Sequence, residues 1–167
     1  SKGQINSKSL IDINGIFSFA FYDNKYNSLT LARDPLGVKP LYYADTKIGL
    51  FFASEIKALL PLTSGKYRGV ISNDIDKFSI DKYLTYLFCP GEGTSFKEIK
   101  KLSPGSYLRI KDGNILEIDN WYKTKNQKSN INLTSEINKI DTITQTRNLI
   151  KNAVQRLSLI HISEPTR

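Results

Sequence analysis

A charged corner between two short strands constrains the fold of this chain more than any other feature. It occupies residues 31–43, which spell LARDPLGVKPLYY. From Leu29 to Arg33 large residues alternate with small ones, the period-two pattern of a half-buried strand. Pro35 cannot donate to a sheet and Gly37 tolerates a positive φ, so a tight turn is expected there before a second strand. The sequence therefore predicts strand, turn and strand in immediate succession.

Arg33 and Asp34 are adjacent charges at this corner, and the simplest interpretation of such a pair is a structural clamp rather than a catalytic dyad. Glu55 follows a later strand of the same predicted sheet. We therefore expect the Arg33 and Glu55 side chains to meet near the sheet end and to fix the turn. The predicted structural motif comprises Arg33, Asp34, Gly37, Pro40, Glu55 and Lys57.

Residues 16–22 form an almost continuous apolar run, IFSFAFY, in which three phenylalanines share one face. This pattern predicts a central strand covered on both sides. Further strands are predicted at 29–33, 41–43, 50–54, 106–110 and 115–118. The connections between consecutive strands are short, so neighbours in the sheet should be antiparallel. Asp112-Gly113 is a hairpin signal, and Trp121-Tyr122 is expected to close the folded unit.

Helical spacing of apolar residues predicts the remaining elements. A short helix should cover 56–60 and end before Pro61, and 96–102 should form a helical turn. Ser79 is the expected cap of an amphipathic helix. Its apolar face is expected to lie in the core and consists of Ile80, Tyr83, Leu84, Leu87 and Phe88. Thr142 and Gln145 have capping-box spacing for a last helix.

Charge and cysteine usage exclude several classes of function. The formal net charge is +8, but the 24 basic residues are scattered and form no basic stripe, so nucleic-acid binding is not expected. Cys89 is the single cysteine and His161 the single histidine. With no base at hand, Cys89 is interpreted as structural. A signal peptide and a membrane-spanning run are both lacking, which favours a cytoplasmic protein without a membrane partner.

Four motifs occur together and in order. They are GIFSFAFYD at 15–23, ARDPLGVKPLYY at 32–43, FASEIKAL at 52–59, and CPG followed by LSPGSYL between 89 and 108. In this order and spacing the chain resembles the glutamine-hydrolysing asparagine synthetases over roughly residues 1–157. The resemblance implies an α+β fold, an antiparallel-sheet N-terminal-nucleophile hydrolase (αββα sandwich), here incomplete at its N-terminus.

The resemblance also implies a domain plan. Residues 1–122 correspond to the C-terminal part of a class II glutamine amidotransferase domain, 123–141 to a linker, and 142–157 to the first helix of a synthetase domain. Residues 158–167 are interpreted as an extraneous tail. In that family the nucleophile is an N-terminal cysteine, and the glutamine-binding segments precede the point where this chain starts. We therefore expect no catalytic, glutamine-binding, ATP-binding or metal-binding residue in the chain itself.

The implied parent enzyme is an asparagine synthetase, a ligase of asparagine biosynthesis. It would hydrolyse glutamine and transfer the amide nitrogen to aspartate, with ATP and Mg²⁺ as its cofactors. Its expected partners are glutamine, aspartate and ATP, and a homodimer stays open. Two alternatives are also open: a paralogue that amidates another carboxylate, and a non-catalytic binding module of the same fold.

Overall fold

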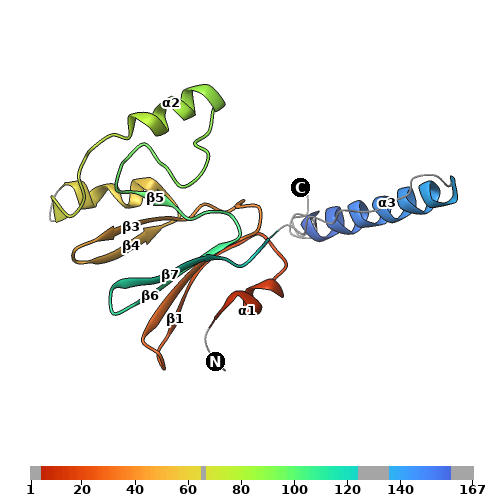
Figure 1. Ribbon diagram of the computed structural model, residues 1–167, viewed down its shortest axis with the longest axis horizontal. Coiled ribbons are helices and arrows are strands. Elements are labelled where there is room, and N and C mark those ends of the chain that lie inside the picture. Colours follow the sequence, from red (N-terminus) through yellow and green to blue (C-terminus); the bar gives the residue numbers. More distant parts are fainter. Residues whose placement is uncertain (1–4, 65–66, 124–135, 159–167) are drawn as a thin grey trace, which may run out of the picture. The chain divides into compact units, whose positions relative to one another are not determined.

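The computed structural model describes residues 5–64, 67–123 and 136–158 and divides the chain into two compact units, 1–124 and 125–167 (Figure 1). The first unit contains two antiparallel sheets, and the described part of the second is a single helix. The chain is therefore of mixed α and β structure with antiparallel sheets, as predicted.

The larger sheet has four strands in the order β1-β2-β6-β7. Their bounds are β1 Ser18–Asp23, β2 Ser28–Arg33, β6 Ser106–Lys111 and β7 Asn114–Asn120. Hairpins join β1 to β2 and β6 to β7, and Asp112 and Gly113 both take positive φ in the second turn. The central pairing of β2 with β6 aligns Ser28 with Lys111 and joins distant parts of the sequence.

The smaller sheet has three strands in the order β4-β3-β5. They are β3 Tyr42–Thr46, β4 Gly49–Ala53 and β5 Lys100–Lys101. The helical turn expected at 96–102 was wrong, because Lys100 and Lys101 instead pair with Tyr43 and Tyr42 of β3. This long-range pairing overrides the local apolar spacing.

The main core lies between the two sheets. It is formed by Leu31, Leu108 and Ile110 of the larger sheet together with Leu41, Tyr43 and Leu102 on the other side. The opposite face of the larger sheet, called the outer face here, carries a second cluster. That cluster consists of Leu10, Ala32, Tyr107 and Trp121, with Ile5, Phe17 and Phe19 packed against it.

The expectation that the first strand is central was wrong for the described residues. There β1 pairs only with β2 and forms an edge of the sheet. Phe17 and Phe19 pack on the outer face, where Phe17 stacks on Trp121 at a centroid distance of 6.0 Å. Phe21, farther along the same face, is 43% exposed. Alternation along the strand therefore indicated which side chains share a face but not how far that face is covered.

The short helix expected at 56–60 is replaced by two 3-10 turns, η1 (Ile56–Ala58) and η2 (Leu60–Thr63). Pro61 lies at the start of η2, where its missing N–H is tolerated. Leu59 and Leu62 are buried in a third cluster with Ala44, Ile71 and Ile99. The turns thus cover the side of the smaller sheet that faces away from the larger one.

Helix α2 spans Lys77–Tyr86, and its N-cap is Asp76 rather than the predicted Ser79. Asp76 accepts hydrogen bonds from the amides of Phe78 and Ser79 and from the Ser79 hydroxyl. The prediction that the apolar face lies in the core was also wrong. Leu84 is 71% exposed and Leu87 80% exposed, whereas the buried residue of the helix is Ser79.

Helix α3 spans Glu136–Ser158 and was predicted to start at 142. It therefore begins inside the range expected for a linker, and Thr142 and Gln145 lie within it instead of capping it. Gln145 donates to Asp141 one turn earlier. Most of the proposed linker, His161 and the tail after Ser158 lie outside the described residues. Within the described ranges, no helix is both long and apolar enough to cross a membrane.

Candidate functional site

The corner predicted from the sequence is built around the buried guanidinium of Arg33. This residue ends β2, and all three of its side-chain nitrogens donate to backbone carbonyls. Nε lies 2.7 Å from the Lys39 oxygen, Nη2 2.6 Å from that of Gly37, and Nη1 2.6 Å from that of Leu102. Two of these carbonyls belong to the turn itself and the third to the segment after β5. Arg33 therefore joins the turn to the smaller sheet.

Asp34 is buried beside Arg33. Its carboxylate accepts hydrogen bonds from the amides of the same turn whose carbonyls Arg33 binds. Oδ1 accepts from the amides of Leu36 and Val38 at 3.1 and 3.0 Å, and Oδ2 accepts from that of Lys39 at 3.0 Å. The carbonyl of Asp34 also accepts from the amides of Gly37 and Gly105. The Arg33 and Asp34 side chains thus bind the backbone of one turn instead of each other.

Electrostatics favour the charged form of Asp34. Burial alone would raise its pKa, but four backbone amides of the turn outweigh this effect and hold the pKa below its usual range. For Arg33 burial is the largest influence and lowers the pKa, while the neighbouring Asp34 carboxylate acts in the opposite direction. Both side chains are buried, and their charged groups bind backbone atoms of the fold.

Gly37 and Pro40 complete the corner. Gly37 takes a φ of +64°, and a Cβ there would lie 2.7 Å from Cγ of Pro104 and 3.1 Å from Cζ of Arg33. Only glycine fits this position without strain or displacement. The carbonyl of Pro40 accepts from the Ser18 hydroxyl at 3.2 Å, so the end of the turn is tied to β1.

The expected ion pair between Arg33 and Glu55 was wrong. The Glu55 side chain is 67% exposed and lies 3.7 Å from Lys57, which is still more exposed. Arg33 is buried and meets carbonyls four and six residues ahead in its own turn. These acceptors are close in sequence, so they can engage the guanidinium without the closing of a long loop. Of the predicted motif, the structure groups Arg33, Asp34, Gly37 and Pro40, and it places Glu55 and Lys57 elsewhere.

Cys89 follows α2 in the chain and packs back against Ser79 of that helix. The thiol lies 3.6 Å from the Ser79 carbonyl, and the Cys89 carbonyl accepts from Nζ of Lys101 at 2.6 Å. Burial lowers the pKa of Lys101. A Cβ on Gly93 would approach within 2.3 Å of the Ser79 hydroxyl, so this side of α2 is closely packed. These contacts pack Cys89 against α2, and its interpretation as structural stays a prediction.

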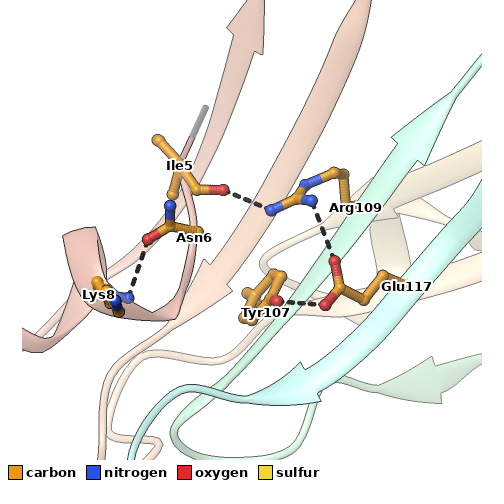
Figure 2. A network of polar contacts seen from close by, with 6 residues as sticks. All are labelled: Ile5, Asn6, Lys8, Tyr107, Arg109 and Glu117. Carbon is orange, nitrogen blue, oxygen red and sulfur yellow. Dashed lines mark hydrogen bonds and ion pairs between the residues drawn. The ribbon is translucent and has the colours of Figure 1, made fainter. Parts of the chain in front are cut away.

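Sequence reasoning missed one polar network, which lies on the outer face of the larger sheet (Figure 2). Arg109 contacts Glu117 at 3.1 Å, Tyr107 donates to Glu117 at 2.6 Å, and Arg109 also donates to the Ile5 carbonyl at 2.6 Å. A usable signal was present in the sequence. Arg109 and Glu117 flank the predicted Asp112-Gly113 turn, and opposite charges across a hairpin commonly pair.

In the part of the chain that the structure describes, no group of three or more His, Cys, Asp or Glu side chains could hold a metal ion. The corner, the Cys89 region and the outer-face network are thus three satisfied polar sites. Each fixes one part of the backbone relative to another. Together they connect the parts of a two-sheet framework.

Comparison with known proteins assigns the class of this framework. The family model for a glutamine amidotransferase domain matches residues 3–122, which include both sheets and all three polar sites. The chain belongs to this glutamine amidotransferase domain family.

Curated relatives narrow the comparison further. The chain is 36% identical over 145 residues to asparagine synthetase [glutamine-hydrolyzing] 3 of Bacillus subtilis, which covers 86% of the chain and 22% of that relative. It is 37% identical over 106 residues to asparagine synthetase [glutamine-hydrolyzing] 1 of the same organism, covering 62% of the chain and 15% of the relative. The chain thus spans about a fifth or less of the length of these relatives.

Proposed function

We propose that this chain is part of a glutamine-dependent amidotransferase that transfers the amide nitrogen of glutamine to aspartate, with an N-terminal-nucleophile hydrolase fold. The observation that carries the proposal is the family match over 3–122, together with relatives named as glutamine-hydrolysing asparagine synthetases. The two packed antiparallel sheets support it, because they are compatible with such a sandwich.

Within this function the described residues serve as the framework rather than as the reacting groups. The charged groups of Arg33 and Asp34 bind backbone atoms of the turn and of Leu102. Cys89 packs against Ser79, and its thiol meets a backbone carbonyl, which is not a base that could activate it. A thiol nucleophile needs such an activating group. We therefore propose that the 167-residue chain does not hydrolyse glutamine by itself.

ATP and Mg²⁺ belong to the proposed parent enzyme, where they would activate the acceptor carboxylate. The described residues offer no carboxylate cluster suited to the metal, so no step with these cofactors is assigned to residues of this chain. In the same proposal, residues 1–122 belong to the glutaminase domain, and α3 marks the start of the synthetase domain after a linker.

The decisive experiment follows nitrogen from glutamine labelled with ¹⁵N at the amide. The full-length protein encoded by the source gene should form labelled asparagine from aspartate in the presence of ATP and Mg²⁺, as measured by mass spectrometry. Glutamate release without labelled asparagine would point to another acceptor and overturn the aspartate part of the proposal. No glutamate release at all would overturn the amidotransferase function.

A second assay tests the framework role of the chain. The purified 167-residue chain should release no ammonia from glutamine above the level of a matched Cys89→Ala variant. Ammonia release that disappears in Cys89→Ala would contradict the assignment of Cys89 as structural and place the chemistry inside this chain.

A further inference from the structure

The outer-face network connects the two ends of the first structural unit. Arg109 in β6 and Glu117 in β7 are directly opposite in the strand register. The Arg109 side chain is only 16% exposed, and its two terminal nitrogens have different partners: Nη1 meets Glu117, and Nη2 meets the Ile5 carbonyl (Figure 2). One guanidinium therefore joins the hairpin β6–β7 to the N-terminal segment.

The N-terminal segment carries helix α1, Ser7–Ile11, which is too short to be stable by itself. Asn6 caps it by accepting from the amides of Lys8 and Ser9. Leu10 is its one buried residue, and Ile11 is largely exposed. The placement of α1 on the sheet thus depends on two anchors: the packing of Leu10 and Ile5 in the outer-face cluster, and the hydrogen bond from Arg109 to the Ile5 carbonyl.

Tyr107 takes part in both anchors. Its ring belongs to the cluster that buries Leu10, and it lies 5.6 Å from the guanidinium carbon of Arg109. Its hydroxyl donates to the Glu117 oxygen that does not contact Arg109. Glu117 is therefore held from both sides and can hold Arg109 in one orientation. A guanidinium with two separate partners suits the planar fork of arginine and not the single amine of lysine.

We propose that Tyr107, Glu117 and Arg109 form a latch that fastens the N-terminal segment Ile5–Ile11 onto the outer face of the sheet. Arg109 makes the contact, and Glu117 and Tyr107 are positioning residues that act through it. The latch constrains the path from α1 to β1, because only residues 12–17 connect them and the carbonyl of Phe17 accepts from the Asp34 amide. Loss of the Arg109 contact should release this segment while the strands of the sheet stay paired.

Hydrogen exchange measured by mass spectrometry on the 167-residue chain tests the latch. The reporters are the amides of Leu10 and Ile13, which bond to the Asn6 and Leu10 carbonyls. Arg109→Lys keeps the charge but cannot reach both partners. Exchange at the reporters should become at least about tenfold faster, the effect expected for losing a hydrogen bond to a charged group. Amides of β2 and β6 should keep their wild-type protection.

Three further variants separate positioning from general stability. Glu117→Gln retains an acceptor and should have a smaller effect than Arg109→Lys, and Tyr107→Phe keeps the ring and should have the smallest. Lys111→Gln is the matched control on the same strand and should change nothing. Unchanged reporter exchange in Arg109→Lys would overturn the latch. Equal acceleration across the whole sheet, or a Tyr107→Phe effect as large as that of Arg109→Lys, would overturn it as well.

Discussion

The Arg33 corner buries charged side chains, whereas helix α2 exposes apolar ones. At the corner two charged side chains are buried, and each polar atom meets a backbone partner. On α2 large apolar side chains lie in solvent, while the buried residue is a serine. The difference teaches that at these two places the available partners, rather than residue polarity, decide which side chains are buried. The turn supplies carbonyls and amides within six residues, whereas an apolar helix face needs a partner from elsewhere.

Among the variants that test this contrast, removal of the Arg33 guanidinium should lower the free energy of unfolding most. Arg33→Met leaves three carbonyls without their donor, one of them buried and two partly buried, so we expect a loss of about 3 kcal/mol in the free energy of unfolding. Urea denaturation followed by circular dichroism measures it. Arg68→Met, at an exposed position, is the control and should stay near wild type. Equal midpoints for the two variants would show that the corner is not a centre of stability.

Asp34→Asn should cost somewhat less, about 2 kcal/mol, because the amide group retains one acceptor oxygen but turns a donor toward the turn amides. Asp34 should also make the stability of the fold fall at acidic pH. The pKa of Asp34 is lowered in the folded state. Its contribution is therefore present above the unfolded value near about 4 and is lost as pH falls through the folded value. Stability curves between pH 6 and pH 2 should be flatter for Asp34→Asn, and parallel curves would contradict this.

Tyr43, in the core between the sheets, should make the stability of the fold fall at alkaline pH. Burial, with Glu92 and Asp45 nearby, raises the pKa of Tyr43 to about 12. The folded state thus retains this proton above the ordinary pKa near about 10, and stability should fall between those two values as pH rises. Thermal melts of the wild type and Tyr43→Phe at pH 9 and pH 11.5 measure the effect. Tyr43→Phe should lose less stability, and an identical loss would exclude Tyr43 as a cause.

The smallest effect is expected on α2. Leu84→Ser replaces an exposed leucine, so the free energy of unfolding should change by less than about 0.5 kcal/mol. Leu108→Ser is the matched core variant and should be strongly destabilising, because it buries a hydroxyl between the sheets. Melts of both variants check the pair. A large loss in Leu84→Ser would show that the chain buries this helix face in solution, and the contrast with the corner would break.

Much of this fold follows from local pattern. The strands around Leu31, Leu50 and Leu108 and the hairpin at Asp112-Gly113 were predictable because alternation and turn residues act over short distances. Strand β5 was not, since Lys100 and Lys101 pair with β3 across a long stretch of chain.

The candidate site divides in the same way. The adjacent charges of Arg33 and Asp34 indicated a corner in the sequence. Their partners are backbone atoms, however, and every residue has these, so residue types do not reveal them. Glu55 was the acidic side chain predicted as the partner of Arg33, whereas the actual partners of Arg33 are carbonyls, and the contact of Arg109 with the Ile5 carbonyl was not predictable for the same reason. The helical period of α2 likewise predicts an apolar face without saying which residues cover it.

The pairing of β2 with β6 has a consequence for the order of folding. The hairpins β1–β2, β3–β4 and β6–β7 need only short loops and can form within microseconds. The central pairing must wait for distant strands to meet, and the bond from Trp121 to the Arg33 carbonyl spans 88 positions. Closing a loop of that length costs about 4 kcal/mol of chain entropy before any core contact compensates it. We therefore expect pairing at the middle of the sheet to limit the rate of folding, so that substitutions in β2 and β6 slow refolding more than those in the hairpin turns.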